Sequence, residues 1–190
     1  RAVSGSTVLY PCDANQTAKL VMTMADRPGI CYLRTTRAAT PVIYYPGDDF
    51  PIGGSKVLRR SDSDQVTVVA AGITVFEALK AADQLQKEHL HVRVIDAYSV
   101  KPIDTVTLLE AVDTTRGRVV IVEDHWAEGG LGDAVLEAIA GTGFPTLKAV
   151  RLAVRTLPGS GKPEQLMNAA GLTAAHIMEA ARSLRGLTVA

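Results

Sequence analysis

The sequence predicts an α/β protein with three layers, in which helices cover both faces of a mostly parallel sheet. Two observations carry this prediction. From residue 66 onward, short runs rich in β-branched residues alternate with longer runs whose apolar residues recur at helical spacing. The strand-like runs also contain few polar residues, which is typical of strands covered on both faces and joined by right-handed crossovers. A smaller, partial α/β unit precedes this sheet.

The partial unit consists of two strand-like runs, residues 7–10 and 30–35, on either side of a predicted helix at residues 13–25. Two strands and one helix cannot cover their own apolar faces, so this unit is too small to be a domain. The chain also begins with Arg1 instead of Met and reaches a strand-like run almost at once. We therefore expect the unit to be the end of a domain whose remainder lies upstream.

The helix of this unit has clear end signals. Asp13 is a natural N-cap with Gln16 three positions later, and the Pro-Gly pair at 28–29 ends the helix. Its predicted apolar stripe is Ala18, Val21 and Ala25.

Between residues 38 and 65 the periodicity lapses, and prolines and glycines accumulate. This composition predicts a long connection between domains, with one possible edge hairpin. We therefore expect residues 1–37 to end a first domain, residues 38–65 to be a linker, and residues 66–190 to form a further domain.

The further domain contains four strand-like runs, at residues 66–70, 92–96, 119–122 and 147–152. The start of its first helix is marked by the sequence Thr74-x-x-Glu77, which has the pattern of a capping box. The second helix is predicted to begin near Asp104. Two more helices are predicted at residues 131–140 and 173–184.

The composition excludes two classes of partner. The 20 basic and 20 acidic residues cancel to a formal net charge of zero, and no run of like charge favours nucleic acid or a membrane surface. No apolar run approaches the roughly 20 residues needed to span a bilayer. Cys12 and Cys31 lack the spacing of metal ligands and suit a reducing compartment, so we expect a cytoplasmic protein.

A polar cluster at residues 123–132 lies between the third strand-like run and its helix. Open parallel sheets bind ligands at the carboxyl ends of their strands, so Glu123 and His125 are candidates for a polar site. The alternative is a tight, hydrogen-bonded turn in which glycines supply unusual backbone angles. The pair Gly130-x-Gly132 fits a dinucleotide fingerprint poorly, because Val135 replaces the third small residue.

Two arginines near the end of the second strand-like run differ in kind. Arg34 lies inside the predicted strand and suits an ordinary paired side chain. Arg37 lies just beyond the carboxyl end of that strand, where a guanidinium can face an anionic ligand. Arg37 is therefore a candidate binding residue.

Six segments together resemble transketolase, in the same order along the chain. They are TVLYPCD (7–13), GICYLRTTR (29–37), DQVTVVAAG (64–72), VIDAYSVKPID (94–104), EDHWAEGG (123–130) and SGKP (160–163). Related thiamine-dependent enzymes share the Glu-x-His-x-x-x-Gly-Gly pattern of the fifth segment. The endings RTTR and SGKP favour transketolase itself.

The resemblance implies that the full-length enzyme transfers a two-carbon ketol unit from phosphorylated ketoses to aldoses in the pentose phosphate pathway. It implies thiamine diphosphate, a divalent cation (Mg or Ca) and a homodimer with active sites at the subunit interface. Arg37 matches the family arginine that binds the sugar phosphate, although Ala38 and Ala39 replace the usual polar residues after it. The family's catalytic, cofactor and metal residues precede Arg1, so we expect the isolated chain to be inactive.

Two other interpretations remain open at this point. The chain is also compatible with another thiamine-dependent enzyme, such as deoxyxylulose-phosphate synthase or a 2-oxoacid dehydrogenase subunit. It is equally compatible with a non-catalytic binding or assembly module.

Overall fold

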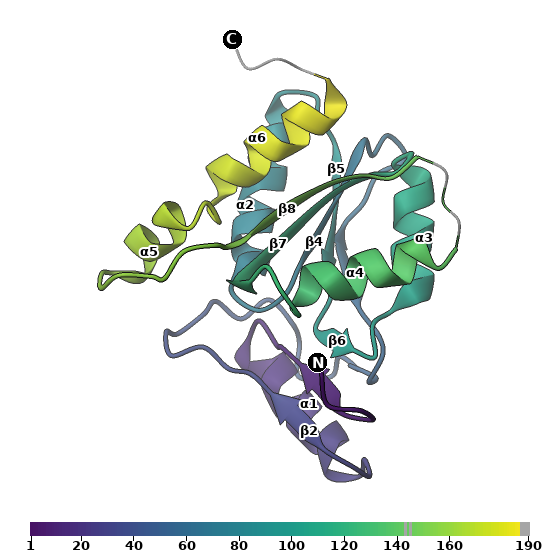
Figure 1. Cartoon of the computed structure of the whole chain (residues 1–190), viewed down its shortest axis with the longest axis vertical. Helices are drawn as coiled ribbons and strands as arrows, with labels where there is room; N and C mark the ends of the chain where they lie inside the picture. The colour runs from purple at the N-terminus through teal and green to yellow at the C-terminus, as the bar shows by residue number, and fades with distance from the viewer. Residues whose placement is uncertain (143, 145, 187–190) are drawn as a thin grey trace.

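The computed structural model describes residues 1–142, 144 and 146–186. Residues 143, 145 and 187–190 belong to the predicted further domain but lie outside the described residues. The described chain contains a five-stranded sheet between two layers of helices and a three-stranded sheet at one end of it (Figure 1).

The large sheet has the strand order β3-β5-β4-β7-β8. Its strands are β3 (Lys56–Arg59), β4 (Val66–Ala70), β5 (Val92–Asp96), β7 (Arg118–Trp126) and β8 (Lys148–Val154). Within the described residues of this sheet, the pairs β4–β5, β4–β7 and β7–β8 are parallel, and only the pair β3–β5 is antiparallel. The prediction of a mostly parallel sheet is therefore confirmed. The edge strand β3 lies in the segment predicted to be a linker.

In the described part of the chain, five helices follow the strands of this sheet. They are α2 (Thr74–Lys87), α3 (Thr105–Thr114), α4 (Leu131–Ala140), α5 (Pro163–Ala169) and α6 (Ala174–Arg185). Alternate strand residues face opposite layers: Val68 and Val120 share a core with α2 and α6, whereas Val69 and Ile121 share a core with α3 and α4. This alternation confirms the predicted three-layer architecture.

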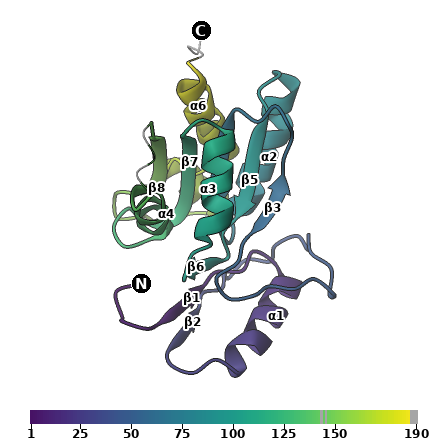
Figure 2. The ribbon, with the colours of Figure 1, turned by 90° about the vertical axis from the view of Figure 1, so that its right-hand side faces the viewer.

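The small sheet joins the two parts of the sequence. Its order is β2-β1-β6, with β1 (Thr7–Leu9) parallel to β2 (Cys31–Leu33) and antiparallel to β6 (Ser99–Lys101). Figure 2 shows this sheet, with α1 (Ala14–Ala25) beside it, below the large sheet. The sequence did not predict β6, because a three-residue strand depends on the partner that it meets in the folded chain.

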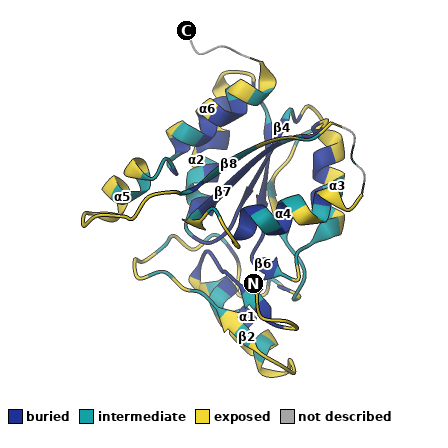
Figure 3. Ribbon diagram, in the orientation of Figure 1, coloured by how far each residue is buried: buried dark blue, intermediate teal, exposed yellow. Residues whose placement is uncertain are grey.

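The apolar stripe predicted for α1 is in the wrong place. The helix buries Gln16 and Leu20, whereas Ala18, Val21 and Ala25 are exposed (Figure 3). Val21 retains 52% of its accessible surface, and Met22 beside it retains 68%. The helix therefore has apolar residues on two faces. The face that packs against the protein includes the buried polar residue Gln16.

The predicted capping box at the start of α2 is also wrong. The hydroxyl of Thr74 bonds the carbonyl oxygens of Ala71 and Val122 at 2.8 and 3.0 Å, so it ties the start of the helix to the residue after β4 and to β7. Glu77 accepts a 2.8 Å hydrogen bond from the amide of Ala174 and thus caps α6 instead. The sequence pattern identified the right helix, but the capping partner comes from another element.

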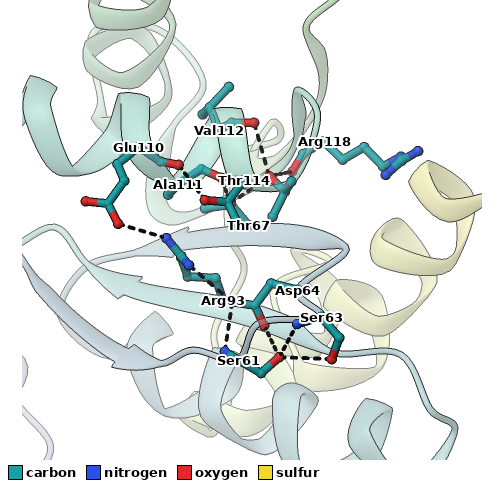
Figure 4. A network of polar contacts seen from close by, with 11 residues as sticks. Ser61, Ser63, Asp64, Thr67, Arg93, Glu110, Ala111, Val112, Thr114 and Arg118 are labelled. Atoms are coloured by element: carbon teal, nitrogen blue, oxygen red, sulfur yellow. Dashed lines mark hydrogen bonds and ion pairs between the residues drawn. The ribbon is translucent and has the colours of Figure 1, made fainter.

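A group of polar contacts lies at the amino ends of the strands of the large sheet (Figure 4). The buried side chain of Arg93 contacts Asp64 at 3.1 Å and Glu110 at 3.6 Å. Nearby, Thr67 and Thr115 share a 2.9 Å hydrogen bond inside the same region. These contacts stabilise the end of the large sheet that lies away from the small sheet. The candidate site residues lie at the other end, beside the small sheet.

Candidate functional site

Arg37 lies four residues beyond β2 and is exposed. A hollow of about 260 Å³ is lined by its neighbours Thr36 and Ala38, together with Cys12, Asp13 and Ala14 at the start of α1. Arg37 itself is not among the lining residues. The structure thus places its guanidinium at the surface beside a concave site at the carboxyl end of β1 and β2.

Asp13 holds the start of α1 and the connection after β2 together. One carboxylate oxygen accepts the amide of Gln16 at 2.8 Å, which confirms the predicted N-cap. The other oxygen accepts the amides of Ile43 and Tyr44 at 2.8 and 2.9 Å. The acid is therefore fully used in positioning backbone around the hollow next to Arg37.

Arg34 directly follows β2, not inside it as predicted, and it pairs across the two sheets. Its guanidinium bonds the carboxylate of Asp124 at 2.7 and 3.3 Å and the carbonyl of the same residue at 3.0 Å. The guanidinium also lies over the ring of Tyr10, 4.5 Å from its centre, and the Tyr10 hydroxyl donates to Asp124 at 2.9 Å. These three side chains hold the small sheet against the carboxyl end of β7.

Burial governs the ionisation of this cluster. It raises the pKa of Asp124 above its ordinary value, although Arg34 and the Tyr10 hydroxyl act in the opposite direction. Burial, reinforced by the charge of Asp124, also raises the pKa of Tyr10. Tyr10 therefore stays protonated and continues to donate its hydrogen bond at neutral pH.

Glu123 is buried beneath the turn that leads into α4. Its carboxylate accepts the amides of Leu131 and Gly132 at 2.6 and 3.0 Å, and it pairs with the Nε atom of Arg151 on β8 at 2.8 Å. A Cβ atom on Gly130 would lie 1.9 Å from this carboxylate. The glycine allows the acid to approach the helix start, and a hydrogen-bonded turn therefore describes these residues well.

His125 is exposed at the end of β7, and its Nδ1 atom lies 2.9 Å from the carbonyl oxygen of Trp126. If Nδ1 carries the proton for that bond, Nε2 is left available as an acceptor. His125, Glu123 and Asp124 line one cavity with Arg34, whereas Arg37 does not line it. The structure therefore brings the predicted polar-site residues together and keeps Arg37 in a separate place.

Asp96 is a buried acid that the sequence analysis did not single out. It ends β5 and accepts hydrogen bonds from Gln16 and Tyr44, both at 2.8 Å, while the Cys12 sulfur lies 3.7 Å away. Burial raises its pKa to about 6. An acid that ends a fully buried strand, next to Val94 and Ile95, was the available signal for this cluster.

The part of the chain that the structure describes contains no group of three or more His, Cys, Asp or Glu side chains placed to hold a metal ion. The described residues therefore do not fit a divalent cation site. Across the same residues, no helix has the length and apolar character that crossing a membrane requires.

Comparison with known proteins identifies the family. The sequence profile described as "Transketolase, C-terminal domain" matches residues 55–177, which is more than half of the chain. The chain belongs to the transketolase C-terminal domain family. Transketolase from Homo sapiens is 43% identical over 184 residues, which cover 97% of this chain and 29% of that protein. Transketolase-like protein 1 from Macaca fascicularis is 44% identical over 97% of this chain and 30% of that protein.

Solved transketolase structures are similar as well. The structure described as "Split gene transketolase, inactive beta4 tetramer" has 35% sequence identity and a TM-score of 0.91, covering this whole chain and 61% of that one. Transketolase from Campylobacter jejuni has 15% identity and a TM-score of 0.73, which shows a shared fold alone. The resemblance to transketolases is confirmed, and the chain spans about 30% of the length of the curated relatives that it matches.

Proposed function

We propose that this chain is the C-terminal part of a transketolase whose complete form transfers a two-carbon ketol unit between phosphorylated sugars. The complete enzyme uses thiamine diphosphate and a divalent cation, acts as a cytoplasmic homodimer, and takes ketose donors and aldose acceptors. The observation that carries this proposal is sequence identity of 43–44% with transketolase and a transketolase-like protein over 97% of the chain.

Within this proposal, Arg37 binds the phosphate group of the sugar substrate. Three features support that role: the side chain is exposed, it follows β2 at the carboxyl edge of the small sheet, and it adjoins a hollow of about 260 Å³. A planar guanidinium makes two parallel hydrogen bonds to a phosphate. Phosphate binding needs no acid or base, so Arg37 is able to supply it without a catalytic group beside it.

The test of this function is Arg37→Ala in the complete enzyme. Contacts to a phosphate that does not react are made in the ground state and in the transition state alike, so their loss acts mainly through substrate binding. We expect KM for a phosphorylated acceptor to rise roughly ten- to a few hundred-fold, which corresponds to about 1.5–3 kcal/mol for bonds to a charged group. The turnover number should fall much less, and Arg37→Lys should restore binding only partly.

The matched control is Arg34→Ala, which removes the ion pair with Asp124. This variant should lower stability without discriminating between substrates. The decisive comparison uses a phosphorylated acceptor and its unphosphorylated analogue with the Arg37→Ala enzyme. Equal losses for both acceptors would mean that Arg37 has a structural role.

A second candidate function is an assembly module without activity of its own. One solved structure that covers this whole chain is described as an inactive β4 tetramer. Analytical ultracentrifugation of the isolated chain, combined with an assay of ketol transfer by the chain mixed with the remaining part of the enzyme, separates the two. Self-association without transfer by the mixture fits this candidate, and ketol transfer by the mixture contradicts it.

A further inference from the structure

A cavity of about 190 Å³ lies between the small sheet and the carboxyl ends of β4 and β7. The chain passes from β4 through α2 to β5, and from β5 through α3 to β7 on the other side of β4. These two helices lie on opposite faces of the sheet. The crevice between the carboxyl ends of such diverging strands is the usual ligand site in open α/β sheets.

The small sheet fills part of this crevice and leaves the remainder open. A Cβ atom on Gly72, just after β4, would lie 1.9 Å from the ring of Tyr10. Tyr10 thus occupies the space that a side chain at position 72 would need. The remaining cavity is smaller than the roughly 300–1,000 Å³ typical of drug-sized ligands, so it suits a molecule of a few heavy atoms.

The acids that line the cavity are already paired. Glu123 accepts hydrogen bonds from the start of α4 and from Arg151, and Asp124 accepts from Arg34 and Tyr10. Their charge is thus taken up by groups of the protein itself. Neither carboxylate is left to attract a cation or an amine from solvent.

The unused polar groups in the cavity are donors. Arg1 also lines the cavity; its Nε atom has no hydrogen-bond partner among the described residues but is buried, so it donates to a ligand only after the side chain shifts. The bonds of Arg34 run through its terminal nitrogens, which leaves its Nε–H available within the same residues. His125 adds an exposed ring, whose Nε2 is an acceptor in the neutral form described above and becomes a donor, with a positive charge on the ring, only in the doubly protonated form. Together these groups favour an anion.

The other walls of the cavity are apolar. They include Val8 and Leu9 of the small sheet, Val100 of β6 and Leu131 at the start of α4. An apolar lining with a few convergent polar groups is the usual composition of a small-molecule site. The anion that fits best has one charged end and a short apolar body.

We propose that this cavity binds a small monocarboxylate, with its charged group facing Arg34, Arg1 and His125 and its hydrocarbon body against Val8 and Leu131. Arg37 does not line the cavity and is not part of this site. Binding there would bridge the two sheets, since its walls come from both.

The test uses the whole chain labelled with ¹⁵N, titrated with butanoate and followed by amide chemical shifts. Butanamide, a neutral molecule of the same shape, and inorganic phosphate serve as comparison probes. We expect saturable shifts at Val8, His125 and Gly130 with butanoate. Butanamide should lack the charge-assisted bonds and bind about tenfold or more weakly. Phosphate should also bind more weakly, because it cannot use the apolar walls.

Variants then connect the shifts to the cavity. Val8→Phe fills the cavity and should abolish saturable binding, whereas Val57→Phe on the exposed edge strand β3 should leave it unchanged. His125→Ala removes an exposed ring and should weaken the binding of butanoate at least several-fold. If Val8→Phe does not fold, the affinity of His125→Ala for butanoate tests the proposal instead.

Three results would overturn the proposal. The first is equal affinity for butanoate and butanamide, and the second is equal affinity for butanoate and phosphate. The third is unchanged binding of butanoate in His125→Ala or in a folded Val8→Phe variant.

Discussion

Asp96 is the residue whose ionisation should affect stability most clearly. One of its oxygens accepts the hydrogen bonds from Gln16 and Tyr44, and the other has no partner among the described residues. Burial raises its pKa to about 6, above the roughly 3.9 of an exposed aspartate. The folded state therefore holds a proton on Asp96 that the unfolded chain has lost, over the range between these two values.

This difference sets the sign of the pH dependence. The stability contributed by protonated Asp96 is fully present below about pH 4 and is lost as the pH rises through about 6. Asp96→Asn keeps an acceptor for Gln16 and Tyr44 but carries no charge. Relative to the wild type, we expect the variant to become more stable from pH 4 to pH 8, by up to about 3 kcal/mol. Urea unfolding at several pH values measures this trend, and a difference that does not change with pH would contradict it.

At the residue scale the sequence located side chains better than it located their partners. Glu123 and His125 do line one cavity, and Asp13 is an N-cap as predicted. The pairing of Arg34 with Asp124 joins residues 90 positions apart, and a single sequence contains no signal for that distance. The phosphate-binding role of Arg37 stays a prediction.

Among the elements, α4 depends most on a single side chain. Glu123 satisfies two amides at its start and pairs with Arg151, while Arg151 also contacts Asp133 in the first turn at 2.7 Å. The acid thus holds the end of β7, the start of α4 and β8 together. An acid at a helix start is further stabilised by the helix dipole.

Glu123→Ala should therefore lower the free energy of unfolding by about 3–5 kcal/mol. The substitution removes one acceptor from Arg151, which is mostly buried, and leaves the two amides at the start of α4 without their acceptor. Glu137→Ala on the solvent side of the same helix is the control and should change stability by less than about 1 kcal/mol. Thermal unfolding of both variants compares them directly. A loss for Glu123→Ala as small as that of the control would show that the acid is not structural.

The sequence predicted long, periodic elements well and short ones poorly. It placed α4 at residues 131–140, the bounds that the structure has, because Leu131, Val135 and Ile139 all face the core. It predicted an edge hairpin where the structure has the single edge strand β3 of four residues, and it missed β6 and α5, which have three and seven residues. Elements this short gain most of their stability from packing and pairing in the folded chain, so their own residues give little signal.

For the whole molecule, the two sheets should differ in local stability. In the large sheet β4 and β5 are buried along their whole length, whereas β2 is an edge strand whose residues are exposed or partly exposed. The outer face of α1 is exposed as well. Few buried contacts and an unpaired edge favour local opening.

Amide hydrogen exchange should therefore be faster over residues 7–35 than over residues 66–122. The measurement is made at low protein concentration, so that association does not cover β2 and α1. Uniform protection across both ranges would contradict a separate first unit. The proposed domain boundaries, which divide the chain into residues 1–37, 38–65 and 66–190, stay predictions. The pairing of β6 with β1 nevertheless joins the first two strands to the rest of the chain.

The overall architecture was predictable because alternating strands and amphipathic helices leave few arrangements of a parallel sheet. How the small sheet docks was not, since it depends on Tyr10 fitting above Gly72 and on the ion pair of Arg34. Both are properties of side chains that meet only in the folded chain.

The central claim is that this chain is the C-terminal part of a transketolase and that the thiamine-diphosphate site lies elsewhere in the complete enzyme. Calorimetric titration of the folded chain with thiamine diphosphate and Mg²⁺ tests it most directly, with the complete enzyme as the positive control. The account predicts no saturable heat for the chain alone and clear binding by the complete enzyme. Saturable binding of the cofactor to the isolated chain would contradict it.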